Sequence, residues 1–324
     1  MNEKIRFGSR KKSLKIMSEH ITVLLREAVE HLNIRPDGVY VDATVGGGGH
    51  SEAILRRLTT GRLIGFDQDD YALMVAGQRL AGLGNFSPVK ANFSRLRECL
   101  SELGIRRIDG IVYDLGVSSF QFDMPERGFS YQSDALLDMR MDPSGPITAY
   151  DLVNGADSAH LLEILYRYGE EANAKQIVKG ILKARATAPI RTTFDLVNVI
   201  KCSLPDKILS KKGHPAKQTF QALRIAVNDE LRVFENSLLQ AIELLNPGGR
   251  VVVITFHSLE DRICKTIFRE KSTVEIPKGL AIIPTEKPVL SLVNKHVILP
   301  SETEQKANNR AHSAKMRVAE KNPF

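Results

Sequence analysis

The sequence predicts an α/β protein in which helices cover both faces of a parallel β-sheet and a helical domain is inserted after the fourth strand. Two observations predict this class. Short β-rich runs alternate with helix-like runs up to residue 114, and the alternation resumes near residue 250, as is typical of βαβ units. Between residues 133 and 214 no strong strand pattern occurs, whereas 159–168 and 172–185 are helix-like, which indicates the insert.

The first half of the expected sheet comes from four short β-rich runs. They lie at residues 39–41, 62–66, 87–90 and 108–113. A helix-like stretch at 22–32 precedes them, a second helix is expected from Ser51 to near Gly61, and further helices fill the next two gaps. Because a helix connects each strand to the next, this half of the chain is expected to wind as parallel units.

The second half begins with a long apolar stripe. Its members recur three or four residues apart, as on one face of an α-helix; they are Phe220, Leu223, Val227, Leu231, Phe234, Leu238, Ile242 and Leu245. The stripe predicts one continuous helix, which Pro247 and the two glycines after it end. A buried strand at 250–256, a helix at 259–269 and a strand pair near 293–299 and 314–319 are expected to complete the chain.

The composition is ordinary for a protein with a buried core, but the charge is unevenly distributed. The 324 residues are 43% hydrophobic and include 45 Lys and Arg against 38 Asp and Glu, a net charge of +7. Residues 175–217 hold ten basic residues and two acids, and residues 1–15 hold six basic residues and one acid. Because regional positive charge suits a phosphate backbone, the pattern favours a nucleic-acid partner.

The cysteines and the apolar runs bear on where in the cell the protein is expected, and the charge and strand patterns bear on its expected domains. Cys99, Cys202 and Cys264 are far apart without metal-ligand spacing, so we expect reduced thiols in a cytoplasmic protein and no metal. No apolar run approaches the length of a membrane span. The expected organisation is a flexible basic extension at 1–19, a core formed by 20–132 and 215–324, and the helical insert at 133–214.

Four consecutive glycines follow the first expected strand and precede a helix. Glycine lets a ligand approach the backbone, and a helix start offers free N–H groups, so Gly46, Gly48 and Gly49 are predicted to contact a nucleotide-like ligand. Asp67 ends the next strand, 21 residues after Gly46, where a carboxylate suits hydrogen bonds to ribose hydroxyls. A tight turn followed by a solvated acid is the weaker alternative.

The glycine loop fits a dinucleotide poorly. The dinucleotide fingerprint requires glycine at its sixth position, where this chain has Ser51. Asp42 precedes the glycines instead, which resembles the loop of class I methyltransferases that use S-adenosylmethionine (SAM). An acid attracts cationic SAM and repels a phosphate, and no Gly-Lys-Ser/Thr sequence of a P-loop occurs. SAM is therefore the expected cofactor.

Polar residues follow two expected strands where a substrate would meet the cofactor. Asp114 ends the fourth strand, and His257 and Ser258 follow the strand at 250–256. Ligands of open α/β sheets bind beyond such carboxyl ends, so these three are the predicted catalytic residues; the alternative for Ser258 is that it caps the next helix. No Pro-Cys dipeptide supplies the nucleophile for carbon-5 cytosine methylation, whereas an exocyclic amine needs only alignment and a proton acceptor.

Taken together, these blocks closely resemble the bacterial 16S ribosomal RNA cytosine-N4 methyltransferase family, known as MraW or RsmH. The matching blocks are residues 20–25, 46–50, 114–119, 126–130, 137–142, 168–171, 219–224 and 256–262. The resemblance implies a class I SAM-dependent methyltransferase fold, Rossmann-like, with a mostly parallel seven-stranded sheet and an inserted helical substrate-recognition domain. It also implies methyl transfer to N4 of a decoding-centre cytidine in 16S ribosomal RNA, with the small ribosomal subunit as partner.

The resemblance adds site residues and leaves alternatives open. It implies SAM contacts from Gly48, Gly49, His50, Asp67, Phe93, Asp114 and Gln121, with Phe93 beside the adenine. The chain departs from the family at Ala135-Leu136, where Gly-Pro is usual, and at His312, where Arg is usual. A nicotinamide-dependent oxidoreductase and a non-catalytic RNA-binding assembly protein are the alternatives, and the oligomeric state is open between monomer and homodimer.

Overall fold

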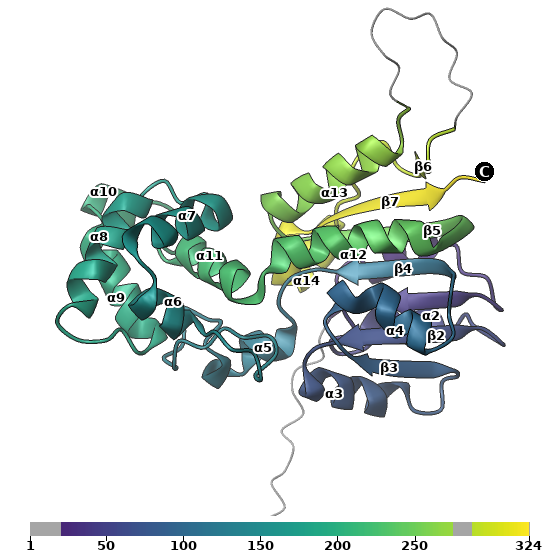
Figure 1. Cartoon of the computed structure of the whole chain (residues 1–324), viewed down its shortest axis with the longest axis horizontal. Helices are drawn as coiled ribbons and strands as arrows, with labels where there is room; N and C mark the ends of the chain where they lie inside the picture. The colour runs from purple at the N-terminus through teal and green to yellow at the C-terminus, as the bar shows by residue number, and fades with distance from the viewer. Residues whose placement is uncertain (1–20, 275–286, 324) are drawn as a thin grey trace, which may run out of the picture.

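The computed structural model describes residues 21–274 and 287–323, and a seven-stranded sheet forms its right-hand part in Figure 1. The strands are β1 (Val39–Asp42), β2 (Arg62–Asp67), β3 (Phe86–Lys90), β4 (Ile108–Asp114), β5 (Leu245–Thr255), β6 (Leu290–Leu292) and β7 (Lys315–Lys321). Their order is β3-β2-β1-β4-β5-β7-β6. β1 to β5 run parallel, whereas β7 is antiparallel to β5 and β6. This order confirms the class I methyltransferase fold.

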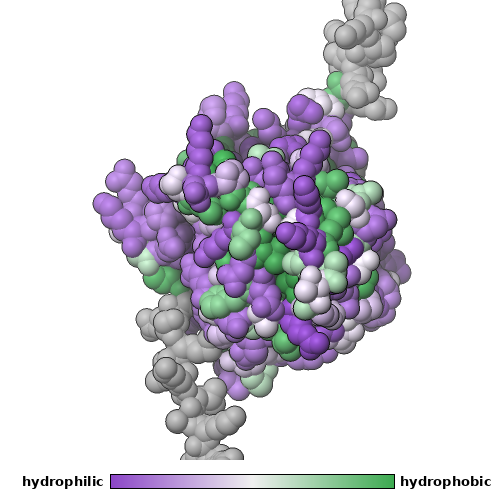
Figure 2. Space-filling view, turned by 90° about the vertical axis from the view of Figure 1, so that its left-hand side faces the viewer, coloured by the Kyte–Doolittle hydropathy of each residue, from purple (hydrophilic) through white to green (hydrophobic). Residues whose placement is uncertain are grey.

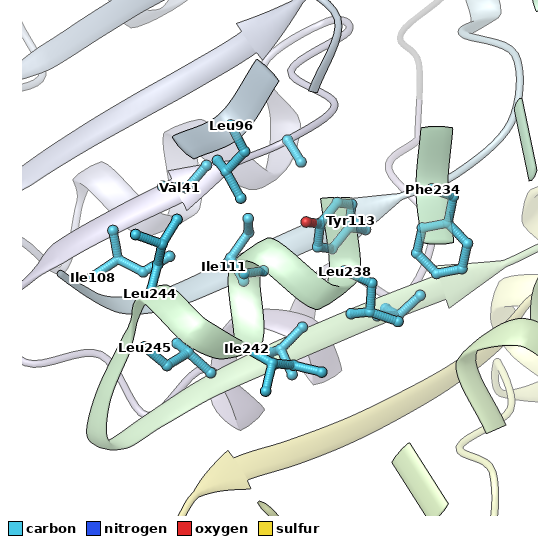
Figure 3. Packing of buried hydrophobic residues seen from close by; sticks show 14 of the residues in the cluster. Val41, Leu96, Ile108, Ile111, Tyr113, Phe234, Leu238, Ile242, Leu244 and Leu245 are labelled. Carbon is cyan, nitrogen blue, oxygen red and sulfur yellow. The ribbon is translucent and has the colours of Figure 1, made fainter. Parts of the chain in front are cut away.

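Apolar side chains alternate along the central strands and divide the core between the two faces of the sheet. Ile111 and Val253 pack on one face, shown in part in Figure 3, and Val112 and Val252 pack on the other, because successive strand residues point to opposite sides. The first face is covered by α4 (Leu96–Glu102), α12 (Glu230–Leu244) and α13 (Ser258–Lys271), and the second by α1 (Leu25–His31), α2 (Gly49–Leu55) and α3 (Asp70–Leu80).

A separate group of helices lies beside the sheet, at the left of Figure 1. Its members are α6 (Ala149–Gly155), α7 (Ser158–Gly169), α8 (Ala174–Arg185), α9 (Thr193–Ser203), α10 (Asp206–Leu209) and α11 (Lys217–Asn228). These helices share one apolar cluster that runs from Phe129 to Leu223 and is distinct from the two clusters of the sheet. Because Phe220 and Leu223 of α11 belong to it, this core extends beyond residue 214.

The predicted continuous helix over residues 220–245 is wrong. α11 ends at Asn228 and α12 begins at Glu230, because Asp229 between them has a left-handed φ of 50°. Asn228 turns its amide toward the chain after β4: Nδ2 donates to the Met139 carbonyl at 2.8 Å, and Oδ1 accepts the Met141 N–H at 2.7 Å. Each half buries its own apolar face, so the periodicity continues across the break and could not reveal it.

The predicted strand at 293–299 is also wrong. β6 covers Leu290–Leu292, and the following residues contribute an isolated bridge between Ile298 and Met316. The remaining short elements are α5 (Ser119–Asp123), α14 (Glu302–Ala307) and the 3-10 turns η1 (Phe93–Arg95), η2 (Pro125–Arg127) and η3 (Asn309–Ser313). The predicted extension at 1–19 lies outside the described residues. Within the described ranges no helix is long and apolar enough to cross a membrane.

Candidate active site

A pocket of about 420 Å³ opens at the carboxyl ends of the parallel strands. It lies where the strand order reverses between β1 and β4, which is where open α/β sheets bind ligands. The predicted site residues that line it are Gly46, Gly49, His50, Asp67, Phe93, Asp114, Gln121 and His257. Gly48 and Ser258, which also belong to the described part of the chain, do not line it.

Asp67 holds the glycine loop at the edge of this pocket. Its Oδ2 accepts the backbone N–H of Gly46 at 2.9 Å, and its Oδ1 accepts that of Asp69 at 2.9 Å. Burial raises the pKa of Asp67 to about 6, although these two donors oppose the rise.

At the start of α2, a Cβ on Gly49 would lie 1.8 Å from the Thr22 hydroxyl oxygen. Glycine at this position therefore lets the N-terminal segment pass against the loop.

Asp42 supports the loop from behind, and Gly48 makes the left-handed turn at the N-cap of α2. Asp42 is fully buried; its Oδ2 accepts the Ser51 hydroxyl at 2.6 Å and its Oδ1 accepts the Thr44 N–H at 3.1 Å. It therefore braces the loop and acts on a ligand only through its charge. Gly48 has a φ of 78°, and a Cβ there would meet Ala76 at 3.4 Å. Its glycine is required by backbone conformation.

Asp114 ends β4 and lines the pocket. Its Oδ1 is buried without a hydrogen-bond partner among the described residues, while its Oδ2 lies 3.7 Å from His50 Nδ1. Burial and then the charge of Asp42 raise the pKa of Asp114 to about 8, and Arg310 opposes the rise. Burying a polar atom without a partner is costly. This oxygen is therefore a strong candidate for contact with a ligand.

His257 lines the pocket, but both of its ring nitrogens face Glu260. The Glu260 backbone N–H donates to Nδ1 at 3.4 Å, and Nε2 lies 3.1 Å from Glu260 Oε1. Glu260 Oε2 also accepts the Phe256 N–H at 2.8 Å. His257 is thus the N-cap of α13, and the alternative in which Ser258 caps this helix is wrong. The Ser258 hydroxyl donates to Glu170 Oε2 at 2.8 Å instead.

Comparison with known proteins identifies the family. Residues 17–322 match the MraW methylase family. The chain belongs to the MraW methylase family. Among solved structures it is similar to an rRNA methylase from Streptococcus thermophilus, at 11% identity and a TM-score of 0.42 over 92% of this chain and 94% of that one. It is also similar to a SAM-dependent O-methyltransferase from Thermotoga maritima, at 10% identity and a TM-score of 0.39 over 93% and 65% of the two chains.

Membership of the MraW family establishes the activity. The protein is a SAM-dependent methyltransferase that modifies N4 of a cytosine in 16S ribosomal RNA. The pocket fits SAM, because Asp67 lines it with acceptor oxygens that suit ribose hydroxyls and Phe93 lines it with a ring that suits the adenine. The nearest described atom to a Cβ on Gly46 would be the Thr44 carbonyl oxygen at 3.8 Å, so glycine there leaves space for the ligand.

The MraW-family pocket also contains residues that the sequence analysis missed. Arg310 and Phe122 both line it, and the guanidinium carbon lies 5.4 Å from the ring centre. Thr22 lines it as well, and just before it the Ile21 carbonyl accepts Asn308 Nδ2 at 2.8 Å. Segments from opposite ends of the sequence thus form one wall. The block at 20–25 pointed to Thr22, but no local pattern indicates that the two segments meet.

Helix α11 supplies another missed part of the wall through Lys217, Gln221 and Arg224. Arg224 donates to both carboxylate oxygens of Glu230, at 2.8 and 2.9 Å. This pair spans the break between α11 and α12. In the straight helix that the apolar pattern predicted, residues six apart would not share a face, so the pair could not be foreseen. His312, the second departure from the family pattern, is exposed and does not line the pocket.

Proposed function

We propose that Asp114 accepts the amine hydrogen of the target cytosine and that the helical insert holds the RNA around it. One observation supports the role of Asp114. Asp114 Oδ1 is buried at the pocket without a hydrogen-bond partner among the described residues, whereas both ring nitrogens of His257 face Glu260. His257 Nε2 is also buried without a hydrogen-bond partner in the described part of the chain, but because Nδ1 accepts the Glu260 N–H, Nε2 carries the hydrogen of the neutral ring and is a donor. Of the three predicted catalytic residues, Asp114 is therefore the one that offers the pocket an unpaired acceptor atom.

The chemistry requires an acceptor because a cytosine amine is a weak nucleophile whose lone pair is delocalised into the ring. SAM, when bound, supplies an electrophilic methyl group. Asp114 accepts a hydrogen bond from N4–H and so holds the nitrogen in line with that methyl group. As the N–C bond forms, N4 loses one hydrogen as a proton to the carboxylate. The pKa of about 8 supports this role, since general bases are most effective when their pKa lies near the working pH.

The cofactor is proposed to lie in the pocket beyond the carboxyl ends of β1 and β2. Asp67 would bind the ribose hydroxyls, and the N–H groups of the glycine loop would face the amino-acid part. Phe93 offers an apolar surface for the adenine and packs edge-on against Tyr113, with ring centres 5.8 Å apart. Gln121 is buried, and its Oε1 accepts the Ser118 N–H at 3.1 Å. This bond fixes its amide beside the ligand.

The insert, proposed as residues 133–214, is suited to hold RNA phosphates of the small ribosomal subunit in the cytoplasm. Lys211 and Lys212 of the insert are exposed, and so is Lys217, which begins α11 just after the insert and also lines the pocket. Figure 2 looks onto this end of the molecule, where hydrophilic side chains cover most of the surface between smaller apolar patches. Concentrated positive charge binds a phosphate backbone and releases its counterions. The target base would leave its stack to enter the pocket.

Methyl transfer to undermethylated small subunits tests this proposal. The subunits are incubated with methyl-labelled SAM, and the label is located by nuclease digestion and mass spectrometry. We expect the label on N4 of one cytidine. A methyl group on carbon 5 or on a ribose oxygen would contradict the role given to Asp114, because neither position has an amine hydrogen for it to accept.

A further inference from the structure

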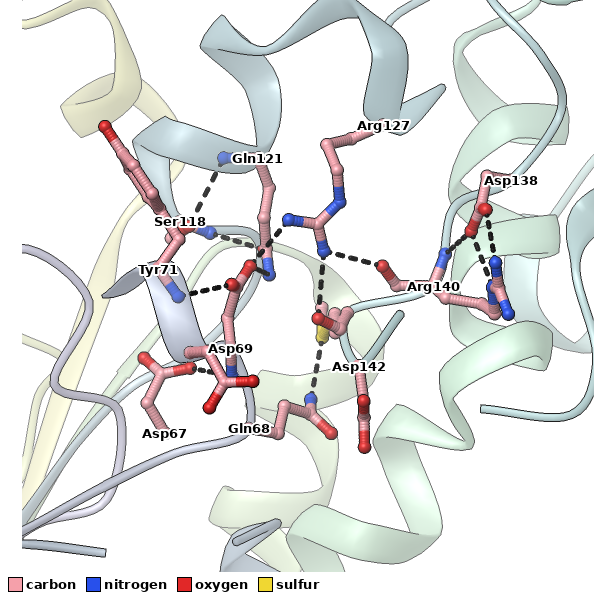
Figure 4. A network of polar contacts seen from close by, with 12 residues as sticks. Asp67, Gln68, Asp69, Tyr71, Ser118, Gln121, Arg127, Asp138, Arg140 and Asp142 are labelled. Carbon is pink, nitrogen blue, oxygen red and sulfur yellow. Dashed lines mark hydrogen bonds and ion pairs between the residues drawn. The ribbon is translucent and has the colours of Figure 1, made fainter. Parts of the chain in front are cut away.

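Arg127 joins the cofactor side of the pocket to the base of the helical insert (Figure 4). Its Nη1 donates to Asp69 Oδ2 at 2.7 Å. Its Nη2 donates to the backbone carbonyls of Arg140 at 3.0 Å and Met141 at 2.9 Å. The exposed fraction is only 15% for the Arg127 side chain and 6% for that of Asp69. The guanidinium therefore holds two distant segments together where water competes little.

Asp69, on one side of this contact, does not line the pocket but supports the wall proposed to hold SAM. Its backbone N–H donates to Asp67 Oδ1 at 2.9 Å. Its Oδ1 accepts the Tyr71 N–H at 3.0 Å and so caps α3. Its Oδ2 accepts Gln121 Nε2 at 3.4 Å in addition to Arg127. A displacement of Arg127 would thus disturb the hydrogen bonds of two predicted cofactor residues.

Met139 and Met141, on the other side, lie in a segment that depends on its partners for its shape. Met139 has a φ of 64°, which a non-glycine residue keeps only where the surroundings hold it. Its N–H donates to the Arg127 carbonyl at 3.1 Å, and its own carbonyl accepts Asn228 Nδ2 at 2.8 Å. Met141 donates its N–H to Asn228 Oδ1 at 2.7 Å. Arg127 and Asn228 together therefore define the course of this segment.

The same segment contacts both the insert and the pocket. Ala149, at the start of α6, donates its N–H to the Asp138 carbonyl at 2.8 Å. Met141 lines the pocket next to Gln68, whose Nε2 lies 3.3 Å from the Met141 sulfur. Gln68 and Met141 thus border the pocket from the two sides that Arg127 connects. A ligand that ordered one side would also order the other through Arg127, so a second ligand would lose less freedom when it binds.

We propose that Arg127 is a positioning residue that couples SAM binding to RNA binding. Arg127 sets the distance between Asp69 and the Met139–Met141 backbone. It acts on binding through these two partners and does not contact the reacting atoms. By thermodynamic linkage, SAM then tightens RNA binding by the same factor by which RNA tightens SAM binding. The inference rests on the proposed function of the insert in holding RNA.

The test uses the product S-adenosylhomocysteine (SAH) in place of SAM, so that no methyl transfer occurs. The Kd for undermethylated small subunits is measured with and without saturating SAH, for the wild type and for Arg127→Met. The wild type is expected to bind at least about fivefold more tightly with SAH, the lower end of the usual range for coupled sites. Arg127→Met is expected to bind equally in both conditions, within about twofold.

Arg140→Met is the matched control. The Arg140 side chain is 24% exposed, and it donates to both carboxylate oxygens of Asp138, at 2.9 and 2.7 Å, and to the Gly145 carbonyl at 2.8 Å. These partners all lie at the base of the insert and none on the cofactor wall. Arg140→Met should therefore lower the melting temperature and keep the wild-type ratio of the two Kd values.

Three results would overturn the coupling. They are a wild-type ratio near 1, an unchanged ratio in Arg127→Met, and an equal loss in Arg140→Met, which would indicate general loosening. If Arg127→Met does not fold, Arg127→Lys replaces it, since Lys keeps a charge beside Asp69 but lacks a second arm for the two carbonyls; its ratio should also fall. Methylation of N4 by the wild type is measured separately, so failure of the coupling and failure of the proposed function are distinguishable.

Discussion

Glu260 turns back over His257 at the start of α13: Glu260 Oε1 lies 3.1 Å from His257 Nε2, and the Glu260 backbone N–H donates to Nδ1 at 3.4 Å. Burial opposes ionisation of Glu260, yet the charge and hydrogen bonds of His257 and the Phe256 N–H hold its pKa below the ordinary value. A buried carboxylate thus stays ionised because the His257 ring, the Phe256 N–H and the charge of Arg224 all favour it. The two residues stabilise the turn that leads from β5 into the pocket wall.

His257→Ala should destabilise the fold by more than the loss of a helix cap. Losing a cap costs about 0.5–2 kcal/mol, and leaving Glu260 Oε1 without the His257 ring adds about 1–3 kcal/mol. Because the pKa of Glu260 is lowered on folding, its stabilisation is present above the ordinary carboxyl pKa and is lost as pH falls through the folded value. Denaturant unfolding at pH 7 and below pH 4 should therefore show a deficit that shrinks in acid. An equal deficit at both values would contradict this account.

Asp114→Asn keeps the shape of the side chain and removes its charge, so turnover should fall by more than about tenfold, or about 1.4 kcal/mol. In the wild type, kcat/KM should rise with pH as Asp114 ionises, with an inflection near the pKa of about 8 in the free enzyme. The variant should lack this rise of kcat/KM with pH. Methylation rates from pH 6 to 9.5 measure both effects. If kcat/KM of the variant rises with pH as in the wild type, another group accepts the proton.

The same raised pKa predicts an effect on stability of the opposite sign. Between the ordinary carboxyl pKa and about 8, folded Asp114 keeps a proton that the unfolded chain has lost, so stability falls as pH rises through this window. Without ligand, Asp114→Asn should melt at a higher temperature than the wild type at pH 9, and the difference should be smaller at pH 5. Calorimetric melting checks this. A variant no more stable than the wild type at pH 9 would mean that burial does not destabilise the charged form.

Asp67→Ala should weaken SAM binding by about 1–3 kcal/mol, the usual effect of losing hydrogen bonds to a charged group. The change also removes the acceptor that holds the Gly46 N–H. Asp70→Ala is the matched control, because Asp70 is a nearby exposed acid that pairs with Lys90 and does not line the pocket. Titration calorimetry should show weaker binding in the first variant only. Equal SAM affinities in the two variants would contradict the ribose contact proposed for Asp67.

Replacing Lys211, Lys212 and Lys217 together with Ala should weaken RNA binding and reduce its salt dependence. Each true phosphate contact contributes roughly one unit to the slope of log affinity against log salt. Arg106 and Arg107, exposed at the opposite end of β4, form a control pair whose replacement should leave the slope unchanged. Filter binding from low to moderate salt measures both. A wild-type slope in the triple variant would assign RNA binding to another surface.

The parts of the fold that local chemistry determines could be predicted from the sequence. β1, β2 and β4 lie within a few residues of the expected runs, because turns and buried apolar runs are properties of neighbouring residues. The break at Asp229 could not be predicted, since Asn228 is held by Met139 and Met141, which are far away in the sequence. Periodicity carries no information about such contacts.

The site shows the same division between local and long-range determinants. Asp67 and Asp114 could be placed because each ends a strand of a parallel sheet, and all such ends meet at one edge. Arg310 and Thr22 could not, because their positions depend on two segments from opposite ends of the sequence. For Ser258 the position after the strand was right, but its side chain points to Glu170 and away from the pocket lining.

The wall that joins Thr22 to Arg310 and Ser313 sets a condition on when the enzyme can begin to act. Translation produces Thr22 early and residues 310–313 nearly three hundred residues later, and nascent chains fold from their N-terminal part onward. The glycine loop and β4 can therefore assemble while this side of the pocket is still open. The pocket wall is thus complete only after the segment at 310–313 has folded against Thr22, which makes the site one of the last parts of the described chain to form.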